Sequence, residues 1–365
     1  MADPWNLIRL VPAEGFELTI MTRTSPFFHR IARFFALFLF ITAPAWATQA
    51  DDGLPRLTVY TYDSFISEWG PGPAVTEAFE ARCNCRLNWV AVDSSLGLMG
   101  RLLLEGGASR ADVVLGLDAA LAAEAAQSGL FTPHGQDTAR LALPAPWTDP
   151  LFLPFDYGYF AFIYDSRRLT EPPRSLRELV FAPAGGPTVI IQDPRSSTPG
   201  LGLLLWIRKV FGAEAPAAWR SLAPRIITAT KSWSEAYGMF LNGEGDMVLS
   251  YTSSAAYHRI AEGVSHYRAA PFTEGHYMQT EVAAKLKTAA QPELADRFMA
   301  FLLSPEFQEA IPTGNWMYPV ISLPDGLPAG FQEDSLPVAL PPHDAATVAR
   351  MRRDWTREWL DATAR

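Results

Sequence analysis

The chain has 365 residues, a formal net charge of −9 and 48% hydrophobic residues, a content typical of packed globular proteins rather than disordered chains. A chain of this length is expected to form about two domains. The acidic balance argues against a nucleic-acid-binding protein, which needs a basic face. Two cysteines are too few for a zinc ribbon, an iron–sulfur cluster or a disulfide-rich scaffold.

The N-terminal segment has the layout of a signal peptide. Arginines precede an apolar stretch, residues 34–43, and Ala45-Trp46-Ala47 follows as a cleavage site. The stretch is shorter than the ~20 residues that a membrane-spanning helix needs. We therefore predict a signal peptide over residues 1–47, with Met21 as the natural start, and export of the remaining chain.

The two cysteines, Cys83 and Cys85, are separated by one residue. Export places them in an oxidising compartment, where disulfides form and persist. Free thiols and a metal-binding pair are the alternatives, but no third ligand accompanies the pair. We expect a structural disulfide.

Strands and helices alternate in the first part of the exported chain. Short β-branched and aromatic runs are followed by segments with apolar residues at helical spacing. The pattern predicts strands over residues 56–62, 86–92 and 111–116, and helices over residues 73–82, 96–105 and 119–128. Such alternation is typical of an α/β fold with a parallel sheet covered by helices.

A long aromatic segment, residues 152–164, follows and exceeds the length that one sheet needs, so it can run from one lobe into another. Beyond it we predict strands over 188–192, 247–251 and 281–284, helices over 200–210, 215–222, 234–242, 292–303, 305–310 and 344–364, and a loop over 323–343. The chain is therefore predicted to form two α/β lobes: residues 54–156 with 275–365 as lobe 1, and residues 157–274 as lobe 2.

The loops after the predicted strands combine aromatic rings, small hydroxyls and a few carboxylates, and ligands of open α/β sheets bind at this end of the strands. Trp69, Trp233 and Trp316 each lie in a polar turn, where a ring can stack on a flat or cationic ligand. Asp63 can offset a positive charge. The hydroxyls of residues 196–198 either cap the following helix or bind a phosphate.

Sequence motifs of common enzyme classes are missing. The chain contains no H-E-x-x-H, no G-x-x-x-x-G-K-[ST] and no G-x-S-x-G motif, and its six histidines never occur at a helical metal-ligand spacing. Composition and pattern alone thus predict an exported, two-lobed α/β binding protein.

Many segments of the chain, in order, resemble the periplasmic thiamine-binding proteins of thiamine ABC importers. The segments include LTVYTYDSF (57–65), EWGPGP (68–73), PFDYGYFAFIYD (154–165), QDPRSSTPGLGLLLW (192–206), SWSEAYG (232–238), VLSYTSSAAYH (248–258) and IPTGNWMYPV (311–320). The resemblance implies a two-lobed periplasmic binding protein fold with the ligand cleft between the lobes. It also implies thiamine, thiamine monophosphate or thiamine diphosphate as the ligand, a membrane permease as partner, no cofactor and a monomer.

Site residues carried over from this resemblance fall into two groups. The ring systems of thiamine would be enclosed by Tyr62, Tyr257 and Trp316, with Trp233 lining the cleft. The hydroxyethyl or phosphate end would be held by Ser197, Thr198, Tyr251, Thr252, Ser253 and Ser254. Ser94 and Ser95 match a loop in which the family carries an acidic residue and a glycine. A ligand contact made by the backbone of this loop would be kept here, but a contact made by the carboxylate would be lost.

Two other functions are compatible with the same fold. A receptor for iron, polyamines or an inorganic anion would use adjacent tyrosines or more carboxylates than these loops contain. A thiaminase-like enzyme would use a cysteine nucleophile, but Cys83 and Cys85 precede the second predicted strand and so lie away from the expected cleft. We therefore expect a binding protein and not an enzyme.

Overall fold

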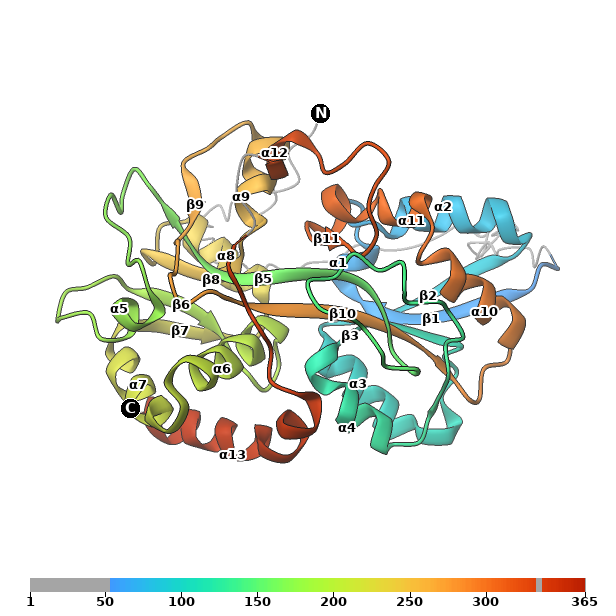
Figure 1. Ribbon diagram of the computed structural model, residues 1–365, viewed down its shortest axis with the longest axis horizontal. Coiled ribbons are helices and arrows are strands. Elements are labelled where there is room, and N and C mark those ends of the chain that lie inside the picture. The colour runs from blue at the N-terminus through green and yellow to red at the C-terminus, as the bar shows by residue number, and fades with distance from the viewer. Residues whose placement is uncertain (1–52, 333–336, 365) are drawn as a thin grey trace, which may run out of the picture. The chain divides into compact units, whose positions relative to one another are not determined.

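The computed structural model describes residues 53–332 and 337–364, so the predicted signal peptide lies outside the described residues (Figure 1). Among them, no helix has the length and apolar character needed to cross a membrane. The predicted α/β class is confirmed, because two groups of parallel strands are each covered by helices. The two groups are called lobe 1 and lobe 2 below.

Lobe 1 is built on three parallel strands in the order β2, β1, β3. Its strands are β1 (Arg56–Tyr62), β2 (Arg86–Val92) and β3 (Val113–Asp118). Its helices are α1 (Asp63–Ile66), α2 (Gly72–Cys83), α3 (Ser95–Glu105), α4 (Ala122–Gln127), α10 (Pro292–Phe301) and α11 (Pro305–Gln308). Since all three strands are parallel, the loops that follow them emerge at one edge of the sheet.

Lobe 2 repeats this plan with parallel strands in the order β8, β6, β7. Its strands are β6 (Val189–Gln192), β7 (Ile226–Thr230), β8 (Met247–Tyr251) and β9 (Tyr267–Ala269). Its helices are α5 (Leu176–Val180), α6 (Thr198–Phe211), α7 (Ala215–Leu222), α8 (Trp233–Leu241) and α9 (Ser254–Tyr257). The loops after β6, β7 and β8 share the second sheet edge.

Two long antiparallel strands, β5 (Leu153–Asp165) and β10 (His276–Leu286), connect the lobes (Figure 1). The first half of β5, up to Tyr159, pairs with β10, while its second half, from Phe160, pairs with β8 and β9. All residues of β5 are buried, which explains its continuous apolar and aromatic character. The prediction that this segment runs from one lobe into the other is confirmed.

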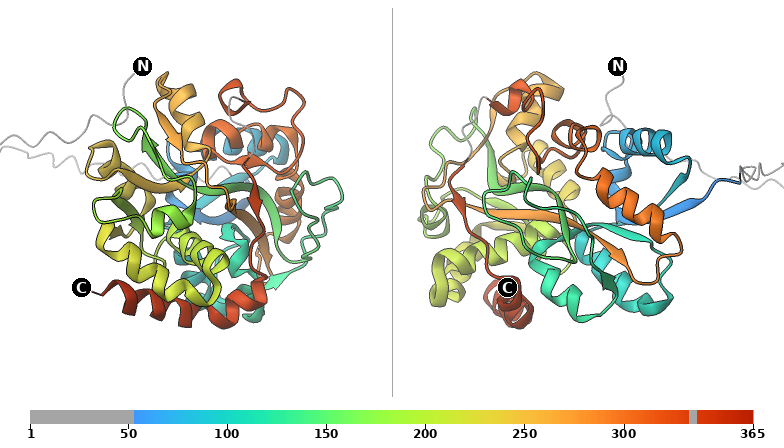
Figure 2. Two further views of the ribbon diagram at one scale, coloured as in Figure 1. Left: turned by 60° about the vertical axis from the view of Figure 1, so that its left-hand side comes forward. Right: turned by 45° about the vertical axis from the view of Figure 1, so that its right-hand side comes forward.

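The C-terminal segment contacts both lobes. It contains β11 (Tyr318–Pro319), α12 (Ala329–Gln332), β12 (Ala339–Leu340) and α13 (Ala345–Thr363). The remaining strand, β4 (Phe131–Thr132), precedes β5 and pairs with β10. Helix α12 packs on α9 of lobe 2, and α13 packs on α6 and α7 of lobe 2 and on α4 of lobe 1. Figure 2 shows α13 running along one side of both lobes. The predicted assignment of residues 275–365 to lobe 1 alone is therefore too simple.

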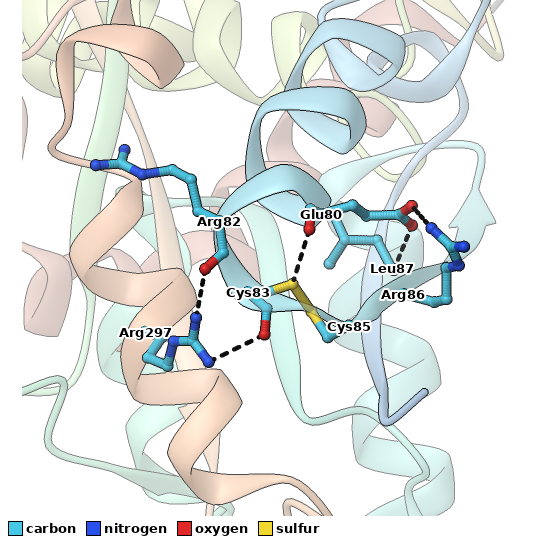
Figure 3. Close-up of a disulfide and its surroundings, with 7 residues drawn as sticks. All are labelled: Glu80, Arg82, Cys83, Cys85, Arg86, Leu87 and Arg297. Carbon is cyan, nitrogen blue, oxygen red and sulfur yellow. Dashed lines mark hydrogen bonds and ion pairs between the residues drawn. A yellow bond between two sulfur atoms is a disulfide. The ribbon is translucent and has the colours of Figure 1, made fainter. Parts of the chain in front are cut away.

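The disulfide between Cys83 and Cys85 is confirmed (Figure 3). Asn84 between them has a left-handed backbone, with φ of 51°, and ends α2 before β2 begins. Arg297 of α10 donates hydrogen bonds to the carbonyl oxygens of Arg82 and Cys83, which have no partner within the helix. The disulfide thus stabilises a helix end at the amino edge of the lobe 1 sheet.

Candidate functional site

Contacts from both lobes bring the two carboxyl edges of the sheets together. Asp93, in the loop after β2, forms an ion pair with Lys231, in the loop after β7, with 2.8 Å between Oδ2 and Nζ. The rings of Trp316 and of Tyr257 in α9 meet edge to face, with 5.0 Å between their centroids. The loops that the sequence analysis singled out therefore face one another in space.

Tyr62 ends β1 with its ring buried and its hydroxyl in a polar network. The hydroxyl donates to Glu281 Oε2 at 2.7 Å and accepts from Asn315 Nδ2 at 2.8 Å. Gly116, with φ of 102°, leaves space for the ring, because a Cβ there would lie 2.3 Å from Tyr62 Cε1. The predicted site residue Tyr62 is thus fixed by contacts from β3, β10 and the C-terminal segment.

Tyr251 ends β8 and belongs to the same network from the lobe 2 side. Its hydroxyl donates to Gln279 Oε1 at 2.7 Å, and Gln279 Nε2 donates to Glu281 Oε1 at 3.3 Å. A Cβ at Gly158 would lie 2.7 Å from Met317 Cε and 3.3 Å from Tyr251 Cδ1, so glycine lets these side chains approach β5. One chain of hydrogen bonds on β10 therefore links the tyrosines of the two lobes.

Three buried carboxyls lie at matching register on adjacent strands. Glu281 of β10 pairs with Asp118 of β3 on one side and with Asp156 of β5 on the other. Directly paired residues have side chains on the same sheet face. We call Asp118, Glu281 and Asp156 the acid row.

Burial raises the pKa of all three carboxyls in the acid row. The pKa of Asp118 rises to about 7, and that of Glu281 rises to about 7 through burial and then through repulsion by Asp118. Burial, followed by electrostatic repulsion from Glu281, raises the pKa of Asp156 well above its ordinary value. Near neutral pH the row therefore holds protons that exposed carboxyls would have lost.

Trp316 follows the π-helical turn η6 (Ile311–Asn315) and has a left-handed backbone, with φ of 55°. Besides meeting Tyr257, its ring lies parallel to that of Phe331 in α12, with 6.5 Å between centroids and 2° between planes. The predicted site residues Trp316 and Tyr257 thus contact each other, and Phe331 contacts the Trp316 ring.

Four predicted hydroxyls have no hydrogen-bond partner in the described part of the chain. They belong to Ser197 and Thr198 at the start of α6, and to Thr252 and Ser253 after β8. Parallel pairing of β6 with β8 places these two loops at the same sheet edge. Unpartnered hydroxyls beside a helix N-terminus suit a hydroxyl or phosphate group of a ligand.

Trp233 and Ser254 are held by protein contacts at this edge. The Trp233 indole Nε1 donates to Ser250 Oγ at 2.8 Å, and Ser250 Oγ lies 2.8 Å from Ser254 Oγ. The Trp233 ring stacks on Tyr237, with 5.0 Å between centroids. Both predicted residues lie at the lobe 2 edge, but their polar atoms already have partners.

The remaining predicted residues lie around the lobe 1 edge. Ser94 Oγ accepts from Gly97 N as the cap of α3, and Ser95 Oγ accepts from Asp118 N at 2.7 Å, so both hydroxyls serve local structure. Asp63 is largely exposed at the start of α1. Partial burial of its carboxyl, followed by the negative charge of Asp93, raises its pKa. Trp69 is 46% exposed.

Several residues of this region were not among the predicted site residues. They are Asp93, Asp118, Asp156, Lys231, Gln279, Glu281, Asn315 and Phe331. Asp93 and Lys231 lie in loops that follow strands, so their position was a usable signal, whereas Asn315 ends the turn η6 after helix α11. The carboxyls of β5 and β10 lie inside strands, where no sequence pattern marked them.

In residues 53–332 and 337–364, no group of three or more histidine, cysteine, aspartate or glutamate side chains is arranged to hold a metal ion. A cavity of about 270 Å³ lies between β7, the edge strand of lobe 2, and α13, and none of the predicted site residues lines it.

Comparisons with known proteins identify the family of the chain. Residues 71–309 match the family described as bacterial extracellular solute-binding protein. The chain is 52% identical to the thiamine-binding periplasmic protein of Salmonella typhimurium strain LT2, over 92% of this chain and 100% of that protein. The chain belongs to this family of periplasmic solute-binding proteins.

Two more matches support the family assignment. The thiamine-binding periplasmic protein of Escherichia coli strain K12 is 53% identical over 90% of this chain and 98% of its own length. A solved structure titled periplasmic thiamin binding protein matches with a TM-score of 0.82 and 54% identity, covering 86% of this chain and 97% of that one. The predicted two-lobed periplasmic binding protein fold is therefore confirmed.

Proposed function

We propose that this periplasmic solute-binding protein captures thiamine and its phosphate esters and delivers them to the permease of an ABC importer. It acts as a monomer, without a cofactor. The observation that carries the proposal is the meeting of tyrosine and tryptophan rings from both lobes beside unpartnered hydroxyls. The relatives named as thiamine-binding proteins, at about half identity over nearly their full length, support the same ligand.

Thiamine has the chemical parts that these residues suit. Its aminopyrimidine is flat and its thiazolium is cationic, so both stack well on Tyr62, Tyr257 and Trp316. Its hydroxyethyl group, or the phosphate in the esters, suits the hydroxyls of Thr198 and Ser253 at the lobe 2 edge. In this arrangement the ligand touches both lobes and holds them together.

An enzymatic function of the same fold has less support. A thiaminase-like reaction needs a cysteine thiolate at the cleft. Cys83 and Cys85 form a disulfide at the amino edge of the lobe 1 sheet, the end opposite the loops that carry the site. We therefore propose that the protein binds thiamine without cleaving it.

Isothermal titration calorimetry with thiamine, thiamine monophosphate and thiamine diphosphate tests the proposal. We expect saturable binding of at least one of the three with one site per chain. Mass spectrometry of the recovered ligand should show intact thiamine. Failure of all three to bind would contradict the proposed function, and recovery of cleaved thiamine would favour the enzyme.

A further inference from the structure

The three carboxyls of the acid row are almost completely buried. Asp118 is 5%, Asp156 0% and Glu281 7% exposed. In the described part of the chain, no lysine, arginine or histidine forms a hydrogen bond or ion pair with any of the three. A buried carboxylate without a countercharge is costly, and the group then retains its proton instead.

Asp156 shows this lack of balance most directly. Its Oδ2 accepts from Asn315 Nδ2 at 2.6 Å, while its Oδ1 is buried and accepts from no described residue outside the acid row. Within the row, the carboxyl of Glu281 is close enough to share a proton with Asp156. The Asn315 amide is neutral, so it does not offset a carboxylate charge. The described residues thus supply no positive charge that would offset the negative charge of an ionised acid row.

The titratable groups that face the row are tyrosines. Tyr62 of β1 bonds directly to Glu281, Tyr251 of β8 bonds through Gln279, and Tyr277 of β10 lies within electrostatic reach of Asp118. Burial, with the charges of Glu281 and Asp156 after it, raises the pKa of Tyr62 well above its ordinary value. All three tyrosines therefore stay neutral, and only the carboxyls exchange protons near neutral pH.

We propose that the acid row selects a cationic ring in the site and releases a proton when that cation binds. The inference rests on the proposed function, because thiamine supplies the cation through its thiazolium. Tyr62 and Tyr251 each end a strand that leads into a loop of the site, and their hydroxyls reach Glu281 of the row directly and through Gln279. A cation against their rings therefore lies near the row, where charge is weakly screened by water. The cation favours the ionised row, and the proton passes from the carboxyl to the buffer.

Proton counting on the unaltered protein is the first test. Thiamine is titrated by calorimetry in two buffers of different ionisation enthalpy at pH 7, and the difference in binding heat gives the protons released. We expect the release of a measurable fraction of one proton per site. With a Glu281 pKa of about 7 in the free protein, one linked proton weakens binding about tenfold from pH 8 to pH 6.

Charge selectivity is the second test. Deazathiamine, the neutral isostere in which carbon replaces the quaternary ring nitrogen, should bind more weakly than thiamine and release no proton. Glu281→Gln keeps an acceptor for Tyr62 but removes the ionisable group. This variant should release fewer protons and should lose much of the preference for thiamine over deazathiamine.

Asp112→Asn provides a matched control, since Asp112 is a buried carboxyl at the opposite end of β3 that accepts from Thr58 N and Gln291 N. It should keep the proton release of the unaltered protein. If thiamine binds without releasing a proton and its affinity does not change between pH 6 and pH 8, this inference alone is overturned. No thiamine binding at any pH would overturn the proposed function as well.

Discussion

Trp316 has a backbone conformation that non-glycine residues rarely adopt, with φ of 55°. A left-handed conformation costs about 1–2 kcal/mol for such a residue, so the surrounding structure must hold it there. The π-helical turn before it and the parallel Phe331 ring provide that support. The strained position presents the indole to Tyr257 of the other lobe.

Replacing Trp316 tests this arrangement. Trp316→Ala removes a stacking surface worth roughly 0.5–2 kcal/mol for a cation, together with buried ring area. We expect thiamine affinity to fall about tenfold or more, and Trp316→Phe to restore much of it. Trp219→Phe, a buried ring in α7, serves as the control. Unchanged affinity of Trp316→Ala in calorimetry would remove this residue from the site.

The unpartnered hydroxyls allow a second prediction at the same scale. Thr198→Ala and Ser253→Ala should weaken thiamine monophosphate more than thiamine, because a hydrogen bond to a charged group is worth about 1.5–3 kcal/mol. Ser175→Ala is a matched control, since Ser175 caps α5 within the same lobe. Equal losses for both ligands would contradict the assignment of these hydroxyls to the phosphate end.

At the scale of elements, the sequence pattern predicted strands best where β-branched and aromatic residues marked them. Strands β1, β2 and β8 have the predicted bounds. Strand β10 is longer than the predicted residues 281–284, because its polar residues look like a loop in the sequence. In the structure, His276 bonds to the Phe160 carbonyl and Gln279 to Tyr251, so both are buried with partners.

Other elements and site residues were missed for related reasons. Strand β7 is short and follows a proline turn, and β4 and β9 exist only through pairing with distant strands. The aromatic residues of the site were predicted from polar turns and from family resemblance. The acid row arises from the register of three strands, which the sequence pattern does not specify.

The disulfide has a role at the end of one element. The loop it closes is so short that the chain-entropy account assigns it only about 1–2 kcal/mol of unfolding free energy. The double variant Cys83→Ser with Cys85→Ser should lose about that much in urea unfolding and bind thiamine within a few-fold of the unaltered protein. Alkylating reagents should label the cysteines only after reduction. Lost binding in a folded double variant would contradict this purely structural role.

At the scale of the molecule, α13 and the facing loops constrain how the lobes move. Arg352 of α13 pairs with Glu124 of lobe 1, and Glu358 of the same helix pairs with Arg208 of lobe 2. Any opening of the lobes must therefore shift α13 against one of them. On the ligand side, the ion pair of Asp93 with Lys231 joins the two edges directly.

The ion pair between Asp93 and Lys231 leads to a prediction about closure. A ligand that touches both lobes shifts the equilibrium towards the closed state, and a contact made only in that state adds to its affinity. The pair is exposed, so its contribution is about 0–1 kcal/mol and is screened by salt. Lys231→Met should weaken thiamine binding by up to about fivefold at low salt, and less at high salt.

A double-mutant cycle separates this contact from other effects. Asp93→Asn should weaken binding like Lys231→Met, and the double variant should lose no more than either single one. Arg357→Met is the control, because Arg357 pairs with Asp354 inside α13 and joins no lobes. Fully additive losses in the cycle, or an equal effect of Arg357→Met, would contradict a role in closure.

The pH dependence distinguishes the ion pair from the acid row. The hydrogen bond from Lys231 lowers the pKa of Asp93, so the Asp93 carboxylate stays ionised while the ion pair is formed. The contribution of the ion pair to thiamine affinity is therefore lost only when the pH falls through that lowered pKa. The acid row has raised pKa values and titrates near neutral pH. Lys231→Met should therefore lower the affinity by a constant factor from pH 6 to pH 8, while Glu281→Gln should change the slope. A changed slope in Lys231→Met would show that the two groups of charges are coupled across the site.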